Sequence, residues 1–229
     1  MNGIVIIAPN KLDMLKVCLP SVEHFAKKYN VDVRAVTKEE YFLPKVSGYN
    51  FKIFEKFQAQ HFTDKYDRMI RMDVDIVFNP DCPNIFDEFE PGKVWGVFED
   101  SGNRRGDRRR QIVHIQETMG RIEPKWSKGY FNAGVILTDK KHSPLYEVSR
   151  EELNLHIKKR LGRFKEQNTM NWRARNLGYE IDNMRYRYNH MSKNTDSGHR
   201  QKDSYVIHFA GKQAGKIQKM RELYKFWYG

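Results

Sequence analysis

The stretch Tyr66–Phe78, YDRMIRMDVDIVF, decides the fold of this chain. Its residues are mostly apolar and β-favouring, which is typical of a buried strand. The stretch carries two carboxylates, Asp73 and Asp75, and side chains at i and i+2 of an extended segment point the same way. We therefore expect both carboxylates to converge at the carboxyl end of a strand, where open α/β sheets bind ligands. Hard oxygen donors placed so close together suit Mg²⁺ or Mn²⁺.

The composition fits one globular α/β domain. The chain has 229 residues, of which 39% are hydrophobic and 13% aromatic, and a domain of this size buries a full core. No apolar run approaches the ~20 residues of a membrane span, and the N-terminal IVIIA is too short for a signal sequence, so we expect a cytosolic protein. Two cysteines, Cys18 and Cys82, are too few for a zinc cluster or a disulfide framework, and we expect buried, inert thiols.

The formal net charge is +12. Such an excess suggests an anionic partner, and nucleic acid, a membrane surface and phosphorylated small molecules all qualify. A solvated basic face explains the same charge without any partner.

Hydrophobic periodicity predicts alternating strands and helices. In chain order these are a strand at Ile4–Ala8, a helix over Leu15–Tyr29, a strand at Val31–Thr37, a helix at Phe51–Phe62, the strand quoted above, a turn or short helix at Pro83–Phe86, strands at Val94–Phe98 and Tyr130–Asp139, helices at about Pro144–Leu161 and from Glu166 to Gly178, and strands at Tyr179–Met184 and Tyr205–Phe209. Pro20 predicts a kink or a restart in the first helix. Residues 38–50 and 185–204 are expected to be loops.

Two basic segments stand apart from this pattern. Residues 101–128 contain SGNRRGDRRR, with five arginines at Arg104, Arg105, Arg108, Arg109 and Arg110. We expect a long irregular loop here, which in a compact domain is usually functional or mobile. Residues 216–228, KIQKMRELYKFWY, predict a basic amphipathic helix. This helix either packs a stripe of Met220, Leu223 and Phe226 against the domain or rests on an anionic membrane surface.

The order of several motifs resembles a known family. The D-x-D strand is followed by YFNAGV, then by Glu166-Gln167 opening a helix, and then by YVIHF with glycine and lysine after it. This succession resembles the family 8 glycosyltransferases, which transfer a sugar from a nucleotide donor with retention of anomeric configuration. The resemblance extends from the first strand to about Lys216. It implies a single GT-A domain over residues 1–229, an α/β, Rossmann-like fold with a mixed, mostly parallel central sheet flanked by helices.

The resemblance also implies a metal site. Asp73 and Asp75 match two ligands of a divalent cation, and His208 matches the third. Two carboxylates, one imidazole and diphosphate oxygens suit Mn²⁺, with Mg²⁺ as the other choice. The cation would neutralise the charge on the departing nucleoside diphosphate. Arg71 stands where the family usually has an apolar or aromatic residue, and the sequence alone assigns it no role.

A donor site follows from the same resemblance, which implies a UDP-sugar donor and leaves the acceptor (carbohydrate, lipid-linked or protein) open. The implied donor-binding residues are Ala8, Asn10, Lys11, Lys56, Val74, Asn132, Gly211, Lys212 and Lys216. Asn10 stands where the family has an acidic residue. Lys56 stands where the family has an arginine, so the positive charge is kept but the bidentate N–H donors of a guanidinium are lost. The family continues with Pro-Trp where this chain reads GKQAGK, so either Lys212 or Lys216 supplies the phosphate-binding cation.

Three residues match the catalytic positions of the family: Asp100, Glu166 and Gln167. Gln167 matches the residue on the β face of the anomeric carbon. An amide is a poor nucleophile, so we favour a front-face route in which the leaving phosphate helps deprotonate the acceptor and Gln167 stabilises an oxocarbenium-like state.

Two other functions account for part of the sequence. A nucleic-acid-binding protein would use the arginine-rich segment and the terminal helix, where basic and aromatic residues alternate. A sugar nucleotidyltransferase would use the same paired aspartates and metal. The first leaves Asp73, Asp75, Asn132 and His208 unexplained, and the second would release pyrophosphate.

Overall fold

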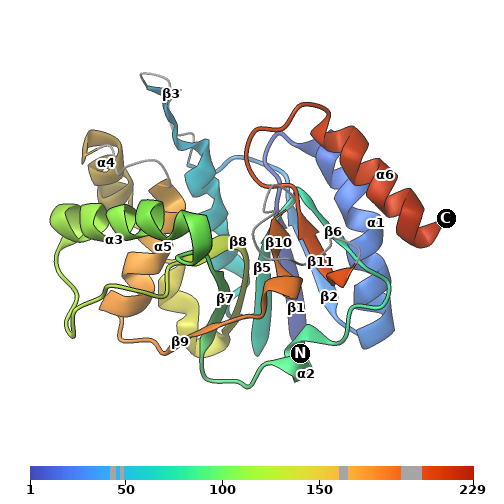
Figure 1. Cartoon of the computed structure of the whole chain (residues 1–229), viewed down its shortest axis with the longest axis horizontal. Helices are drawn as coiled ribbons and strands as arrows, with labels where there is room; N and C mark the ends of the chain where they lie inside the picture. The colour runs from blue at the N-terminus through green and yellow to red at the C-terminus, as the bar shows by residue number, and fades with distance from the viewer. Residues whose placement is uncertain (42–44, 47–48, 160–164, 192–202) are drawn as a thin grey trace.

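The computed structural model describes the whole chain except residues 42–44, 47–48, 160–164 and 192–202 (Figure 1). Its elements, with η for a 3₁₀ helix, are β1 (Asn2–Ile7), α1 (Leu12–Tyr29), β2 (Asp32–Val36), β3 (Lys45–Val46), β4 (Tyr49–Asn50), η1 (Phe51–Phe62), β5 (Arg68–Asp73), β6 (Ile76–Phe78), α2 (Ile85–Glu88), β7 (Val94–Phe98), η2 (Gly102–Arg104), α3 (Arg105–Met119), β8 (Phe131–Asp139), η3 (Lys140–Leu145), α4 (Arg150–Lys159), α5 (Lys165–Asn176), β9 (Ile181–Asn183), η4 (Tyr186–Tyr188), β10 (His190–Met191), β11 (Val206–His208) and α6 (Lys216–Tyr228).

A mixed sheet forms the centre of the molecule, in the strand order β2-β1-β5-β8-β7-β9. Strand β1 pairs in parallel with β2 and β5, and β7 pairs in parallel with β9, whereas β8 runs antiparallel to both of its neighbours. Helices α1 and α6 lie on one side of the sheet, and α3, α4 and α5 lie on the other (Figure 1). The predicted α/β class with a mostly parallel sheet flanked by helices is confirmed.

The two faces of the sheet belong to two hydrophobic clusters. In β1, Ile4 and Ile6 join the cluster with α1 and α6, while Val5 and Ile7 join the cluster with η1 and α5. This division follows from the two-residue period of a strand, whose successive side chains point to opposite faces. Strands covered on both faces read as continuous apolar runs, which explains the sequence GIVII.

The quoted stretch is two strands. Strand β5 ends at Asp73, and after Val74 and Asp75 the chain enters β6, which belongs to a second sheet of order β10-β11-β6. In that sheet His208 pairs with Ile76, and the backbone N–H of Phe209 donates to the carbonyl of Asp75 at 2.8 Å. The change of sheet therefore places β11, and with it His208, beside the two aspartates.

The prediction of an irregular loop over residues 101–128 is wrong for residues 102–119. They form η2 and then α3, a helix of 15 residues, and residues 120–128 are irregular as expected. The helix buries Arg108, Ile112 and Ile115, which follow one another at helical spacing. Arg108 is buried because its guanidinium pairs with Glu99 at 2.9 Å. The helical stripe was hidden because one of its buried positions is an arginine.

Other expectations need smaller corrections. Helix α1 continues through Pro20 without restarting. The single helix expected near Pro144–Leu161 is η3 followed by α4, and its predicted end at Leu161 lies outside the described residues. The loops expected at 38–50 and 185–204 contain the short elements β3, β4, η4 and β10, and parts of both lie outside the described residues.

Helix α6 packs against α1, but with a different stripe from the predicted one. Met220 is fully buried and Leu223 is partly buried, whereas Phe226 is 71% exposed. Ile217, Tyr224 and Trp227 complete the packed face. Among the described helices, none has both the length and the apolar character that crossing a bilayer requires.

Both cysteines are free and buried, as predicted. Burial raises the pKa of the Cys18 thiol to about 12, so this group stays protonated at neutral pH. A protonated, buried thiol is unreactive, which agrees with a packing role.

Candidate active site

The centre of the site is a group of three side chains: Asp73, Asp75 and His208. One potential ligand atom from each lies within 4.8 Å of the others. His208 Nε2 is 3.3 Å from Asp75 Oδ1 and 3.8 Å from Asp73 Oδ2. The structure thus brings together the three residues that the sequence predicted as metal ligands, with two of them at the β5–β6 break and the third on β11.

The orientation of His208 is set by its other ring nitrogen. Nδ1 lies 2.9 Å from Asn189 Oδ1. The Nδ2 atom of the same Asn189 amide donates to Asn132 Oδ1 at 2.9 Å, so the amide oxygen is the atom that faces the ring and accepts. Nδ1 is therefore the atom that donates to Asn189, and Nε2 is the ring nitrogen directed at the two aspartates. This second hydrogen bond is what metal-ligating histidines have. The donor set fits a divalent cation.

Gly134 explains why the strand motif reads NAG. A Cβ at this position would overlap the His208 ring and would also contact the Asn132 side-chain oxygen. Only a residue without a side chain allows β8 and the imidazole to approach so closely. Glycine in YFNAGV is therefore part of the architecture of the site.

Three cations surround the aspartates. Lys56 Nζ is 2.9 Å from Asp73 Oδ2, Arg71 Nη2 is 2.7 Å from Asp73 Oδ1, and Lys216 Nζ is 2.6 Å from Asp75 Oδ2. Burial by itself raises a carboxyl pKa, but Lys56 and Arg71 outweigh it and hold the pKa of Asp73 below its usual value. His208 and Lys216 likewise outweigh burial at Asp75, whose pKa lies far below the usual value. Both acids are therefore ionised at neutral pH.

Glu166 opens α5 and faces the same cluster. Its Oε1 accepts from Lys56 Nζ at 2.7 Å. Lys56 therefore bridges Glu166 and Asp73, which are 93 residues apart in the chain. Burial alone lowers the pKa of a lysine, but these two carboxylates outweigh burial and raise the pKa of Lys56. The lysine is charged and fixed between two predicted site residues.

Gln167 is buried and locked by hydrogen bonds. Its Oε1 accepts from the backbone N–H of Ala133 at 3.0 Å and from Asn132 Nδ2 at 3.2 Å, and its Nε2 donates to Glu99 Oε2 at 3.0 Å. The amide is thus held in one orientation between β8 and β7. A hydrogen-bonded amide network of this kind provides fixed dipoles.

The acid in contact with this network is Glu99. Its side chain is 1% exposed and also accepts from Arg104 Nη1 at 2.6 Å and from Arg108 Nε at 2.9 Å. The neighbouring Asp100 turns the other way, and its carboxylate accepts from the backbone N–H groups of Gly129 and Tyr130. The structure therefore brings Glu99, rather than the predicted Asp100, to Asn132 and Gln167.

The remaining predicted residues lie at the carboxyl end of β1 and in the turn after β11. Ala8 and Val74 are buried, whereas Asn10 and Lys11 are exposed at the start of α1, with Asn10 hydrogen-bonded to Glu39. Gly211 has a φ of +74°, a conformation that glycine adopts freely. Lys212 is exposed, and of the two candidate lysines it is Lys216 that contacts the aspartates.

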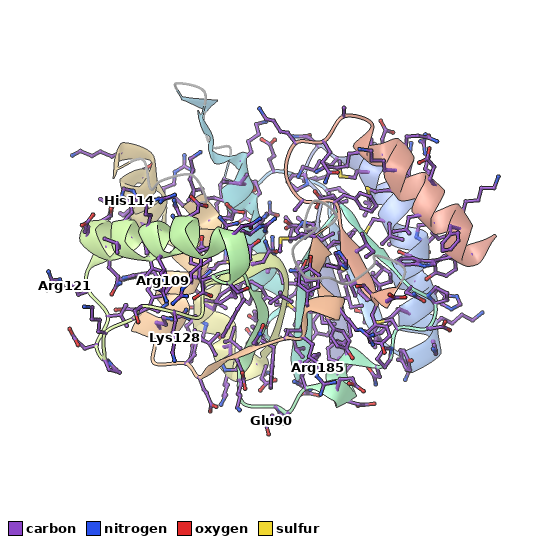
Figure 2. All side chains as sticks on the ribbon, viewed as in Figure 1. Glu90, Arg109, His114, Arg121, Lys128 and Arg185 are labelled. Atoms are coloured by element: carbon purple, nitrogen blue, oxygen red, sulfur yellow. The ribbon has the colours of Figure 1, made fainter. Side chains whose placement is uncertain are left out.

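The arginine-rich helix contributes to the site at one end only. Arg104 and Arg108 reach Glu99, as described above. Figure 2 shows Arg109, Arg121 and Lys128 on α3 and the segment after it, on the side of the molecule away from β11 and α6. The basic residues are thus divided between the site and an outer face.

Sequence reasoning missed Glu99 and Asn189 and left Arg71 without a role. Arg71 had a visible signal, because it precedes Asp73 by two residues and shares its face of the strand. Asn189 had none, since it lies 19 residues before His208 in a polar segment and approaches it only through the pairing of β10 with β11.

Taken together, the residues suit three kinds of ligand atom. Two carboxylates and an imidazole suit a divalent cation. Lysines at the edge of that cluster suit phosphate oxygens, and the Asn132, Gln167 and Glu99 group suits hydroxyls.

Comparison with known proteins supports this interpretation. The sequence profile described as "Glycosyl transferase family 8" matches residues 6–214. A comparison with curated protein sequences gives no match.

Similar solved structures include the galactosyltransferase LgtC in complex with donor and acceptor sugar analogs, at 14% identity and a TM-score of 0.61 over 100% of this chain and 97% of that chain. A glycosyltransferase involved in glycosylation of the major capsid of PBCV-1 has 13% identity and a TM-score of 0.63 over 96% and 98% of the two chains. Mouse xyloside xylosyltransferase 1 has 14% identity and a TM-score of 0.50 over 91% and 97%. At these identities the likeness shows a shared fold, that of the GT-A glycosyltransferases.

Proposed function

Because the chain belongs to glycosyl transferase family 8 and is a glycosyltransferase, we propose that it moves a hexose from a UDP-sugar to an acceptor hydroxyl, with retention of configuration and with the help of a divalent cation. The acceptor is a carbohydrate, a lipid-linked sugar or a protein. The observation that carries the proposal is the Asp73, Asp75 and His208 group, held within 4.8 Å at the carboxyl end of β5.

The cation would be held by Asp73 Oδ2, Asp75 Oδ1 and His208 Nε2, the atoms that approach one another in this group. Mn²⁺ suits two carboxylate oxygens with one imidazole nitrogen, and Mg²⁺ is the alternative. When bound, the cation supplies electrostatic stabilisation of the charge that develops on the leaving diphosphate.

Lys216 and Lys56 would bind the diphosphate. Both are only 15% exposed and lie against the acidic pair, so each is placed to exchange a carboxylate contact for a phosphate contact. Gly211 offers bare backbone in the turn that precedes α6. Of the two lysines that the sequence left open, the contact with Asp75 favours Lys216.

Asn132, Gln167 and Glu99 would bind the donor sugar. The hydrogen bonds from Ala133 and Asn132 hold Gln167 Oε1 in place, so it acts as a fixed dipole for a developing positive charge at the anomeric carbon. Glu166 is engaged by Lys56 at 2.7 Å, which lowers its strength as a nucleophile. Both observations support a front-face reaction in which the acceptor proton passes to the leaving diphosphate.

We extend the proposal to the domain organisation. Residues 1–229 act as one catalytic domain, because β1, β5, β8, α5, β11 and α6 all contribute to the site. Lys216, the first residue of α6, contacts an aspartate 141 positions earlier.

The test is an assay of nucleoside diphosphate release from a panel of nucleotide-sugars with Mn²⁺, in the presence of simple acceptors. We expect turnover of at least one UDP-sugar and a loss of roughly a hundredfold or more in Asp75→Asn. Asp81→Asn, which removes an exposed carboxylate near by in the sequence, is the matched control and should retain wild-type turnover.

Three outcomes would contradict the proposal. Wild-type turnover in Asp75→Asn would remove the role of the acidic pair. Release of pyrophosphate would identify a nucleotidyltransferase. A covalent sugar adduct trapped on Glu166 or Gln167 would exclude the front-face route.

A further inference from the structure

Arg71 is a fully buried arginine in the middle of β5, two residues before Asp73. Its Nη1 donates to the backbone carbonyl of Ala133 on β8, and its Nη2 donates to Asp73 Oδ1 at 2.7 Å. The guanidinium thus ties the first aspartate of the acidic pair to the neighbouring strand.

Stability does not explain this residue. Arg71 lies on the face of β5 that packs with Met69 in an apolar cluster, and its Nε has no hydrogen-bond partner among the described residues. Replacing both members of a buried ion pair by apolar side chains of similar volume is often neutral or stabilising, so an apolar pair would fill these positions without an unpaired N–H. What the arginine specifically adds is therefore its contact with a charged Asp73.

The contact with Asp73 uses one of the two carboxylate oxygens. Oδ1 accepts from the guanidinium. Oδ2 lies 3.8 Å from His208 Nε2 and accepts from Lys56 Nζ at 2.9 Å, which is the contact proposed above to pass to the diphosphate. A carboxylate whose Oδ1 is occupied by a charged donor offers one oxygen to a cation. Asp75 is in a similar position, because its Oδ2 accepts from Lys216 at 2.6 Å and its Oδ1 faces His208.

We propose that Arg71 is a positioning residue that restricts Asp73 to a single ligand oxygen, and that it thereby selects a small octahedral cation over Ca²⁺. Calcium binds six to eight oxygen ligands and often both oxygens of one carboxylate. Mg²⁺ and Mn²⁺ bind six ligands in octahedral geometry and suit carboxylates that each provide one oxygen. This inference rests on the proposed metal-dependent function. It adds to that function the residue that sets which metal is accepted.

The test measures cation affinity on the purified full chain and does not use turnover. Free Mn²⁺ is followed by electron paramagnetic resonance as MnCl₂ is titrated, and CaCl₂ is then added as a competitor. The quantity compared is the ratio of the two dissociation constants, Ca²⁺ over Mn²⁺. In Arg71→Met we expect this ratio to fall roughly tenfold, the size of effect that residues behind metal ligands commonly have.

Arg68→Met is the matched control. Arg68 begins the same strand, is also mostly buried and pairs with Asp139 at 2.9 Å, away from the acidic pair. The same substitution there removes the same charge, and the Ca²⁺ over Mn²⁺ ratio should stay at the wild-type value. A fall in both variants would show a general effect of charge removal and would overturn the proposal.

If Arg71→Met does not fold, the same ratio of dissociation constants is measured on Arg71→Lys. A lysine keeps the charge but lacks the planar fork that spans Ala133 and Asp73, so the ratio should still fall. A ratio within twofold of wild type in a folded Arg71 variant overturns the inference and leaves the proposed function standing. No Mn²⁺ binding to the wild-type protein overturns both.

Discussion

Asn189 Oδ1 lies 2.9 Å from His208 Nδ1, and the same amide donates to Asn132 Oδ1 at 2.9 Å. One side chain immediately before the short strand β10 therefore orients the imidazole and joins it to the asparagine proposed to bind the donor sugar. The proposed cation site and the proposed sugar site share a buried hydrogen-bond network.

Asn189→Ala removes the acceptor that fixes the orientation of His208. We expect Mn²⁺ affinity to fall roughly tenfold to a hundredfold, because the ring is then free to rotate and Nε2 is no longer held toward the aspartates. Titration of free Mn²⁺ by electron paramagnetic resonance measures this change. Asn176→Ala, at an exposed position, should bind Mn²⁺ like the wild type, and an unchanged affinity in Asn189→Ala would show that His208 needs no such support.

The family resemblance placed Asp100 and Gln167 together at the catalytic positions, but we expect substitution of Asp100 to affect stability and substitution of Gln167 to affect turnover. Asp100→Asn loses one of the two carboxylate oxygens that accept from Gly129 and Tyr130, so we expect a loss of about 1–3 kcal/mol in the free energy of unfolding. The kcat of the folded protein should stay within roughly tenfold of wild type, whereas Gln167→Ala should lower kcat by about a hundredfold. A stable Asp100→Asn with a hundredfold lower kcat would place Asp100 at the reacting atoms.

His142 makes stability depend on pH. The ring is buried, its Nδ1 accepts from the backbone N–H of Asp139 at 3.0 Å, and burial lowers its pKa below the ordinary 6.5 despite the nearby Asp139 carboxylate. Between the folded and unfolded pKa values the unfolded chain binds more protons, so this contribution to stability is complete above about pH 6.5 and is lost as the pH falls below it.

The substitution His142→Asn should therefore flatten the acid side of the stability profile, measured by urea unfolding at a series of pH values. His24→Asn, at an exposed histidine, should keep the wild-type slope. A wild-type slope in His142→Asn would assign the acid loss to other groups.

Met220 and Phe226 test how α6 is attached. Met220 is fully buried against the core, whereas Phe226 is 71% exposed. Met220→Ala should lower the free energy of unfolding by roughly 2–5 kcal/mol, and Phe226→Ala should change it by about 0.5 kcal/mol or less. Urea unfolding measures both, and equal losses would contradict the observed packing face.

Much of the fold was predictable because it rests on local patterns. Continuous apolar runs such as GIVII mark strands covered on both faces, and the strand that precedes the two aspartates ends at Asp73 as its apolar pattern indicated, with Asp75 in the bend that follows. His208 was predictable only through its resemblance to a family motif. Nothing in its immediate sequence distinguishes it from a core histidine.

The rest could not be predicted because it depends on contacts between different elements. Helix α3 was hidden by Arg108, which is buried with Glu99 as an ion-pair partner, and a sequence pattern counts such an arginine as a surface residue. Asn189 reaches His208 through the pairing of β10 with β11. In both cases the place of a polar residue is fixed by a partner on another element.

The change of sheet between β5 and β6 has a consequence for the biosynthesis of the enzyme. Asp73 and Asp75 emerge from the ribosome early, but His208 and Lys216 follow more than 130 residues later. At synthesis rates of about 5–20 residues per second, these partners are synthesised several seconds or more after the two aspartates. The proposed cation site is thus one of the last features that the nascent chain completes, and an incomplete chain that ends before β11 carries an acidic pair without its histidine.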